Sequence, residues 1–258
     1  LVFPFENEMS NEAIEEILEE NEHVIHLWEP LEFKIDENYD YVPNNLIFSI
    51  FSNFLYYGIA FPILKLLTKI IYDLKIEGIE NIKEVDGGAI SVSNHVLILD
   101  CAMVGLAFGK RKIYYTTQEG SFKIPLVRKL IKYLRAVPIP ENINNRKYFI
   151  KAMNNVLENG DIIHFYPEAS LWPYCKKIRN FKNGAFDFAV KNNVPIIPMA
   201  YKFRKPEGYR KIFKIKPDVT LSILKPIEAN MNEDNIKVCI EELKIKVKRA
   251  MEEELKAV

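Results

Sequence analysis

Beyond residue 73, short apolar segments alternate with segments of helical periodicity, and this alternation limits the possible folds more than any other feature. The expected strands are residues 74–79, 88–93, 112–117, 136–139, 161–166, 194–201 and 219–224. The expected helices are residues 98–108, 122–134, 144–158, 183–192 and 233–256. Strands separated by helices pair in parallel, because the chain crosses back over the sheet between them. The sequence therefore predicts an α/β fold with a mixed, largely parallel sheet flanked by helices.

Residues 46–64 form a run of nineteen residues without a charged side chain. A helix needs about 20 apolar residues to cross the core of a bilayer, so this run reaches that length only marginally. Tyr56 and Tyr57 at its centre suit a membrane interface better than the midplane. The run favours a membrane-associated helix, or a pair of helices broken near Pro62, lying in one leaflet. A buried helix of a soluble protein is the alternative.

Charge is strongly segregated along the chain, although the formal net charge is zero. Residues 1–45 carry thirteen acidic side chains and one basic one, so the remaining residues have an excess of twelve positive charges. A basic body favours an anionic partner. A membrane with anionic headgroups would account for both the basic body and the apolar run. Nucleic acid does not explain that run, so we expect no nucleic-acid partner. We predict an acidic leader (1–45, with a helix at 11–27), a membrane-associated helical segment (46–72) and an α/β domain (73–258).

The three cysteines are widely spaced and form no CxxC pair. This arrangement argues against a disulfide framework and a structural zinc site, and for a reducing compartment. No set of His, Cys, Asp and Glu has metal-ligand spacing, and the sequence contains no GxxxxGK[ST] loop. We therefore expect no metal and no cofactor. No secretory signal pattern opens the chain, so we do not expect secretion.

The segment SNHVLILD (residues 93–100) places His95 after a buried strand and Asp100 five residues later. Five residues turn about 500° on a helix, so these side chains meet only if a tight turn separates them. The carboxylate would then accept the imidazole N–H, leaving the other ring nitrogen to take a proton from a hydroxyl. No Ser or Cys lies in a GxSxG context, so the nucleophile would belong to the substrate. A helix N-cap beside a packed histidine is the alternative.

Three further segments carry polar residues next to expected strands or helices. HFYPEAS (164–170) places Glu168 just after a strand, followed by Ala169 and Ser170. RNFKNGAFDFA (179–189) places Gly184 at a helix start, and VPIIPMAY (194–201) has prolines at both edges of a strand. The order NHxxxxD, [FY]PE, FKxGAFxxA and VPxxP resembles the lysophosphatidic acid (glycerophospholipid) acyltransferase family. The resemblance extends from residues 76–82 to residues 194–201.

This resemblance implies acyl transfer from acyl-coenzyme A or acyl-carrier protein to the free hydroxyl of a lysophospholipid. The expected acceptor is 1-acylglycerol-3-phosphate, which would give phosphatidic acid. His95 would be the general base, Asp100 its orienting partner, and Glu168 part of the acceptor site, with Asn94, Ala169 and Ser170 beside them. The family fold implies that residues 73–258 form the catalytic domain. We expect the protein at the cytoplasmic face of the cell membrane, as a peripheral or monotopic protein.

Two motifs depart from the family pattern. The usual third motif reads FPEGTRS, whereas Glu168 is followed here by Ala169, Ser170 and Leu171. The second motif normally ends in an arginine that contacts the acceptor phosphate, whereas this chain has Pro140 and Glu141 in that neighbourhood. Substitute cations are available nearby in the sequence: Arg146, Lys176, Lys177, Arg179 and Lys182, with Gly184 at the following helix start. Lysine offers a point charge rather than the bidentate fork of arginine.

Two other functions fit the same residues. A thioesterase or lysolipid hydrolase would use the His95–Asp100 pair to activate water. A non-catalytic lipid-binding protein would explain the altered third motif.

Overall fold

The computed structural model describes residues 33–43, 45–124, 127–213, 216–230 and 235–256. The acidic helix expected at residues 11–27 lies outside the described residues. In the described part, a seven-stranded sheet has the order β1-β7-β6-β2-β5-β3-β4. The strands are β1 (Lys75–Glu77), β2 (Ala89–Ser93), β3 (Ile113–Gln118), β4 (Ala136–Ile139), β5 (Ile162–Phe165), β6 (Ile196–Arg204) and β7 (Asp218–Ile223).

The sheet is mixed and largely parallel, as the alternation of strands and helices predicts. Only β6 and β7 pair antiparallel among the described strands, and β2 lies at the centre between β6 and β5. All five residues of β2 are buried. The described residues between β6 and β7 (205–213 and 216–217) form one short helix, α9 (Tyr209–Phe213). Parallel pairing needs a crossover connection, usually a long helix, and β6 and β7 instead pair antiparallel.

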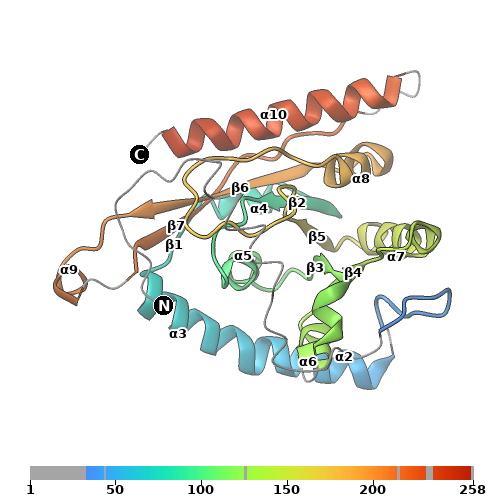
Figure 1. Cartoon of the computed structure of the whole chain (residues 1–258), viewed down its shortest axis with the longest axis horizontal. Coiled ribbons are helices and arrows are strands. Elements are labelled where there is room, and N and C mark those ends of the chain that lie inside the picture. Colours follow the sequence, from blue (N-terminus) through green and yellow to red (C-terminus); the bar gives the residue numbers. More distant parts are fainter. Residues whose placement is uncertain (1–32, 44, 125–126, 214–215, 231–234, 257–258) are drawn as a thin grey trace, which may run out of the picture.

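Helices cover both faces of the sheet (Figure 1). One face carries α7 (Arg146–Glu158), α8 (Gly184–Asn192) and α10 (Ile236–Lys256), which share a single apolar core with the sheet. The other face carries α4 (Glu80–Lys83), α5 (Asp100–Phe108) and the end of α3 (Phe61–Tyr72). The helix expected at 122–134 is instead a 3-10 turn (Glu119–Lys123) followed by α6 (Val127–Tyr133).

Residues 46–72 form one continuous helix rather than a pair broken near Pro62. It consists of α2 (Leu46–Asn53), a π-helical segment (Phe54–Ala60) and α3. Proline lacks an N–H, and its ring crowds the carbonyl four residues earlier. The π-helical segment absorbs this defect, because the N–H of Phe61 bonds to the carbonyl of Tyr56, five residues back. Among the described residues, this is the one helix long and apolar enough to cross a membrane, judged by length and composition.

One side of the 46–72 helix is bonded to the α/β body at several points. The Ser52 hydroxyl donates to the Tyr133 carbonyl at 2.7 Å, and the hydroxyls of Tyr56 and Tyr115 lie 2.9 Å apart. At the other end, the guanidinium of Arg210 donates to the carbonyls of Ile70 and Ile71. These bonds fix the helix along its whole length against the body.

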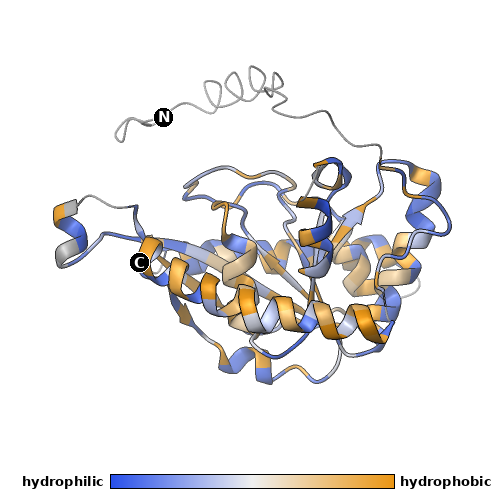
Figure 2. Cartoon of the chain, turned by 90° about the horizontal axis from the view of Figure 1, so that it is seen from below, coloured by the Kyte–Doolittle hydropathy of each residue, from blue (hydrophilic) through white to orange (hydrophobic). Residues whose placement is uncertain are grey.

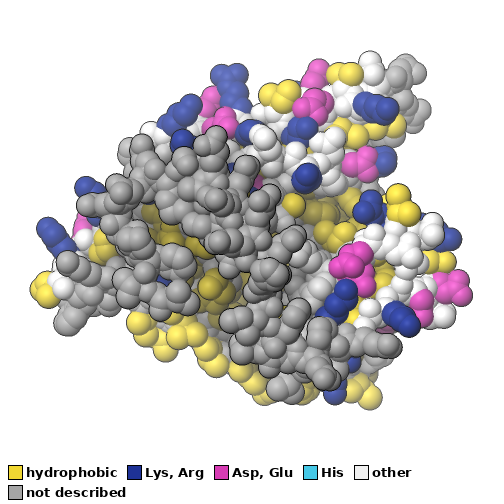
Figure 3. All heavy atoms as spheres, in the orientation of Figure 1, with side chains coloured by type: hydrophobic (Ala, Val, Ile, Leu, Met, Phe, Trp, Pro, Cys, Tyr) yellow, Lys and Arg dark blue, Asp and Glu magenta, His cyan; other side chains and the backbone are white. Residues whose placement is uncertain are grey.

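The opposite side of the same helix is exposed and apolar (Figures 2 and 3). Its exposed side chains are Leu46, Ile47, Ile50, Phe51, Phe54, Ile59, Ile63, Leu66, Leu67 and Ile70. Figure 3 shows this row as a yellow band along the lower edge of the molecule. Only 11 % of the most apolar part of the helix is buried, so a buried soluble-protein helix does not describe it.

The end of the expected acidic leader packs onto the domain core. Ile35 and Tyr41 are both about 95 % buried and belong to the apolar cluster that contains α7 and α8. The side-chain amide of Asn145 also donates to the carbonyl of Ile35. Residues 33–43 therefore belong to the packed body, and the division of the chain at residue 45 stays a prediction.

Gly88, just before β2, provides a test of this packing. An added Cβ there would lie 2.2 Å from the carbonyl oxygen of Leu157 and 2.8 Å from its carbonyl carbon. We expect Gly88→Ala to lower the free energy of unfolding by about 1–3 kcal/mol, because the clash is with backbone. Urea denaturation measures this. Gly120→Ala is the control, since its Cβ would meet no atom within 4 Å. Equal urea midpoints for the two variants would contradict the close approach of Gly88 to the Leu157 backbone.

Candidate active site

The candidate site lies where two neighbouring parallel strands end. β2 ends at Ser93 and continues into Asn94 and His95, while β5 ends at Phe165 and continues into Tyr166. Val92 is opposite Phe165 in the register, so the two loops leave the sheet side by side. Carboxyl ends of parallel strands are where α/β proteins place ligands.

His95 and Asp100 meet as their spacing requires. Nδ1 of His95 lies 2.6 Å from Oδ2 of Asp100, the first residue of α5. The same oxygen accepts the backbone N–H groups of Val96 at 3.2 Å and Leu97 at 3.4 Å, which closes the tight turn. The Asp100 carboxylate is 1 % exposed and the His95 side chain 25 %. Within the described part of the chain, no hydrogen bond engages Nε2 of His95, so that nitrogen is available to a substrate.

Tyr166 and His164 complete the surroundings of this pair. The Tyr166 hydroxyl donates to Oδ1 of Asp100 at 2.9 Å, and its ring stacks on His95 with centroids 4.0 Å apart. Burial and the Asp100 carboxylate raise the pKa of Tyr166, so its hydroxyl keeps its proton. His164 is fully buried behind Tyr166, and burial, with a smaller effect of His95, lowers its pKa to about 3. Sequence reasoning missed Tyr166; its place beside Pro167 and Glu168 at a strand end was the available signal.

Glu168 is buried and holds three segments together. Its Oε2 accepts the backbone N–H of His95 at 3.2 Å, and its Oε1 accepts that of Arg179 at 2.9 Å. The Arg179 guanidinium pairs with Oε2 at 2.9 Å. Arg179 also donates to the Ser170 hydroxyl at 2.7 Å and to the Ser170 carbonyl, and lies over the Trp172 ring. The structure therefore brings Glu168, Ser170 and Arg179 together beside His95, with Arg179 acting as the counter-ion of Glu168.

Ala169 occupies a position that favours glycine. Its φ of 64° lies in the left-handed region, which residues with a Cβ rarely adopt. The side chains of Ala169 and Ser170 are exposed at the surface of this loop. Alanine in place of the glycine of the FPEGTRS pattern therefore puts a side chain in a strained backbone conformation.

The remaining predicted residues lie at varying positions around the site. Lys182 is exposed, and its backbone N–H bonds to the Pro167 carbonyl at 2.8 Å, so its loop adjoins that of Glu168. Gly184 is exposed at the start of α8, where an added Cβ would meet no atom within 4 Å. Lys176 and Lys177 are also exposed.

Asn94 and Arg146 make no hydrogen bond to the His95–Asp100 pair within the described residues. Asn94 is fully buried, and its Oδ1 accepts the backbone N–H of Tyr201 at 2.9 Å, so it joins β2 to β6. Arg146 is exposed at the start of α7, after edge strand β4, which is three strands from β2. No hydrogen bond within the described ranges joins Arg146 to the His95 group.

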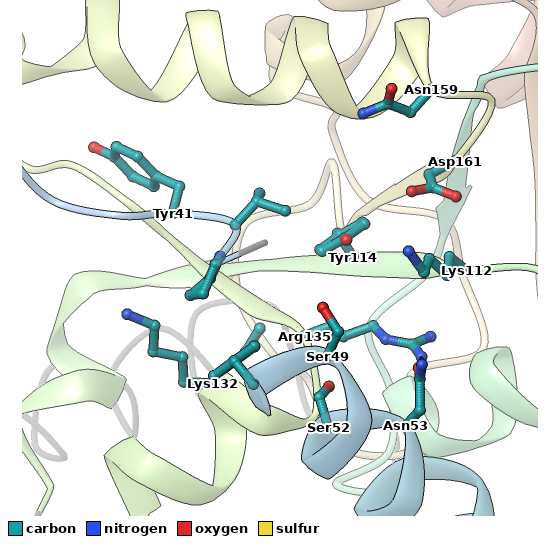
Figure 4. Close-up of a pocket in the computed structure, with 14 residues that line it drawn as sticks. Tyr41, Ser49, Ser52, Asn53, Lys112, Tyr114, Lys132, Arg135, Asn159 and Asp161 are labelled. Carbon is teal, nitrogen blue, oxygen red and sulfur yellow. Dashed lines mark hydrogen bonds between the residues drawn. The ribbon is translucent and has the colours of Figure 1, made fainter. Parts of the chain in front are cut away.

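A cavity of about 310 Å³ lies at the other end of the sheet (Figure 4). Lys112, Arg135 and Asp161, which line it, precede β3, β4 and β5, so the cavity is at the amino ends of these strands. The Arg135 guanidinium donates to Oδ1 of Asn53 at 2.8 Å and lies 4.4 Å from the centroid of the Tyr56 ring. These contacts attach the 46–72 helix to the sheet and place no group near His95.

No group of three or more His, Cys, Asp or Glu among the described residues is arranged to hold a metal ion. The His95–Asp100 pair, the ring of Tyr166 and the Glu168–Arg179 ion pair lie together where β2 and β5 end.

Comparisons with known proteins match much of the α/β body. The sequence profile of the acyltransferase family matches residues 73–202. A chloroplastic 1-acyl-sn-glycerol-3-phosphate acyltransferase of Arabidopsis thaliana is 30 % identical over 129 residues, which are 50 % of this chain and 35 % of that protein. One from Brassica napus is 28 % identical over 160 residues, 60 % of this chain and 45 % of that protein. The chain thus spans less than half the length of these relatives.

The fold also has a solved counterpart. The crystal structure of the 1-acyl-sn-glycerophosphate acyltransferase PlsC from Thermotoga maritima superposes with a TM-score of 0.50 at 25 % identity. The match covers 83 % of this chain and 97 % of that one. The whole of the candidate site lies within the region that the family profile covers.

The buried His164 predicts how stability depends on pH. Its pKa is about 3 in the folded protein and about 6.5 in the unfolded chain, so only the unfolded state takes up this proton below pH 6.5. Above pH 6.5 His164 is neutral in both states and adds no pH dependence to the free energy of unfolding. As pH falls from 6.5 toward 3, protonation of the unfolded chain lowers that free energy. Between pH 7 and pH 5 the loss is about 2 kcal/mol. We expect His164→Asn to remove this part of the pH dependence in urea denaturation; an unchanged slope would contradict it.

Proposed function

The chain belongs to the acyltransferase family, and we propose that it is a membrane-associated enzyme that transfers a fatty acyl group from a thioester to a lysophospholipid hydroxyl. One observation carries the proposal: an imidazole that is held through Nδ1 by a buried carboxylate and has a free Nε2 at a strand end. No Ser or Cys among the described residues bonds to His95. The nucleophile is therefore supplied by the substrate.

The proposed reaction needs one base and forms no acyl-enzyme. Nε2 of His95 takes the proton of the acceptor hydroxyl as that oxygen attacks the carbonyl carbon of the thioester. A new C–O bond forms, the C–S bond breaks, and the departing thiolate takes the proton back from His95. Asp100 retains the Nδ1 proton on the ring and fixes the tautomer throughout.

The proposed acceptor is 1-acylglycerol-3-phosphate, which would yield phosphatidic acid, with acyl-coenzyme A or acyl-carrier protein as donor and no cofactor. The names of the relatives and the exposed cations near the site support this choice. Arg179 is engaged by Glu168 and Ser170, so contact with the acceptor phosphate falls to the exposed Lys176, Lys177 and Lys182. Lysine binds phosphate as a point charge, so several related headgroups are acceptable at such a site.

The 46–72 helix supports membrane association in the plane of one leaflet. A spanning helix is surrounded by lipid or by other membrane-embedded segments, whereas one side of this helix bonds to the α/β body at Ser52, Tyr56 and Ile70. The other side is apolar and exposed, which is the pattern of an interfacial helix. We propose a monotopic protein at the cytoplasmic face, with the basic body beside anionic headgroups.

The function is tested with purified protein in mixed vesicles, using labelled acyl-coenzyme A or acyl-carrier protein and a panel of lysolipids. We expect a diacyl product, and a fall in turnover of about 10²–10⁴-fold in His95→Ala and Asp100→Asn, because a positioned base is lost. The melting temperature of His95→Ala should stay nearly unchanged, because that side chain is 25 % exposed. Asp187→Asn, which changes a partly exposed carboxylate on α8 that pairs with Lys191, is the control. Free fatty acid alone would indicate a hydrolase, and no product with any donor would indicate a lipid-binding protein.

Membrane docking is tested by vesicle co-sedimentation of a double variant, Ile47→Glu with Ile50→Glu. These side chains are 82 % and 60 % exposed. Burying each in lipid contributes about 1.5–3 kcal/mol, so the partition coefficient should fall at least about tenfold. Ile245→Glu is the control, because Ile245 is 56 % exposed on α10, across the sheet. Equal losses in both variants would contradict docking through the 46–72 helix.

A further inference from the structure

Tyr166 contacts both members of the His95–Asp100 pair, with two different parts of its side chain. Its hydroxyl donates to Oδ1 of Asp100 at 2.9 Å, while Oδ2 of the same carboxylate holds His95 Nδ1 at 2.6 Å. Its ring stacks on the imidazole with an interplanar angle of 18°. Each oxygen of the carboxylate thus has its own ring partner, and the two rings lie face to face.

The Tyr166 ring is held in place from its other side. His164 meets it edge to face, with ring centroids 4.6 Å apart. The His164 ring is fixed in turn by the hydroxyls of Ser91 at 2.8 Å and Ser93 at 3.4 Å, both on β2. Since burial keeps His164 neutral, it supports the tyrosine without adding a positive charge beside His95. The orientation of Tyr166 therefore comes from the sheet itself.

We propose that Tyr166 is a positioning residue that tunes the basicity of His95 through the carboxylate of Asp100. The inference rests on the proposed function, in which His95 is the general base. A hydroxyl that donates to a carboxylate draws negative charge toward itself, and the carboxylate then attracts the imidazolium less strongly. The hydroxyl thereby favours the neutral imidazole, which is the form that accepts a proton. The stacked Tyr166 ring holds that imidazole nearly parallel to itself.

Other groups face the pair but do not act on the carboxylate in this way. The Tyr201 hydroxyl, on β6, donates at 2.6 Å to the backbone carbonyl of Asp100. The ionisable groups around the pair from neighbouring elements are Tyr72 on α3, Cys101 on α5, His164 on β5, Tyr201 on β6 and the Glu168–Arg179 ion pair. Within the described ranges, Tyr166 is the one side-chain hydroxyl that bonds to the Asp100 carboxylate.

Two variants separate the hydroxyl from the ring. Tyr166→Phe removes only the hydroxyl, so the carboxylate should bind the imidazolium more strongly and His95 should stay protonated to higher pH. We expect the acid limb of kcat/KM against pH to move up by about 0.5–1 pH unit. Tyr166→Leu also removes the stacked ring, and we expect a similar shift with a further loss in kcat of about tenfold, because the imidazole loses its fixed orientation.

A second readout does not depend on turnover. The chain has four histidines, so ring signals from labelled histidine give at most four titration curves by NMR, and His95→Ala assigns one of them. We expect the His95 midpoint to rise by the same amount in Tyr166→Phe as the acid limb does. Tyr201→Phe is the matched control, since its hydroxyl bonds to the backbone of Asp100 and its removal should leave the midpoint in place.

The outcomes distinguish this inference from the proposed function. A His95 midpoint that is the same in Tyr166→Phe and wild type overturns the role of Tyr166, even if acyl transfer proceeds. A raised midpoint supports it, even if the vesicle assay finds no diacyl product and the proposed function fails. A midpoint that rises equally in Tyr201→Phe also overturns it, because the effect would not depend on the carboxylate.

Discussion

The buried carboxylate of Asp100 is the contact on which the site depends. A buried charge is tolerated only when hydrogen bonds satisfy it, and here four donors do so: two backbone N–H groups, the His95 ring and the Tyr166 hydroxyl. The backbone donors close the turn after β2 and start α5, so one side chain sets both the local fold and the orientation of the imidazole. Loss of that carboxylate would leave the turn and the imidazole of His95 without a common partner.

A second buried carboxylate, that of Glu168, holds the loops around this pair. It bonds to the backbone N–H groups of His95 and Arg179 and to the Arg179 guanidinium. The side chain of Glu168 is 0 % exposed. It therefore fixes the geometry of the loops and is not free to bind solvent or a ligand. In the proposed function, contact with the acceptor phosphate would pass to the exposed Lys176, Lys177 and Lys182.

One side of the 46–72 helix contacts the protein body, and the other side is exposed. Polar groups such as Ser52 and Tyr56 point to the body and find partners there, whereas the isoleucine, leucine and phenylalanine side chains point outward. The sequence shows that these apolar residues exist but not that the helix stays continuous at Pro62. That continuity depends on the π-helical segment before the proline, which hydrophobic periodicity does not reveal.

The sequence by itself determined the α/β class and the approximate positions of the seven described strands, because strand patterns are local properties. It allowed His95 to pair with Asp100 but left a packed histidine as the alternative, and the structure decided between them. It did not determine which residues support that pair. Tyr166, His164 and Arg179 lie 64 or more residues from Asp100, and they meet it or its neighbours only because β2 pairs with β5 in one register. Contacts between distant segments depend on strand order, and strand order is decided by the packing of the whole sheet.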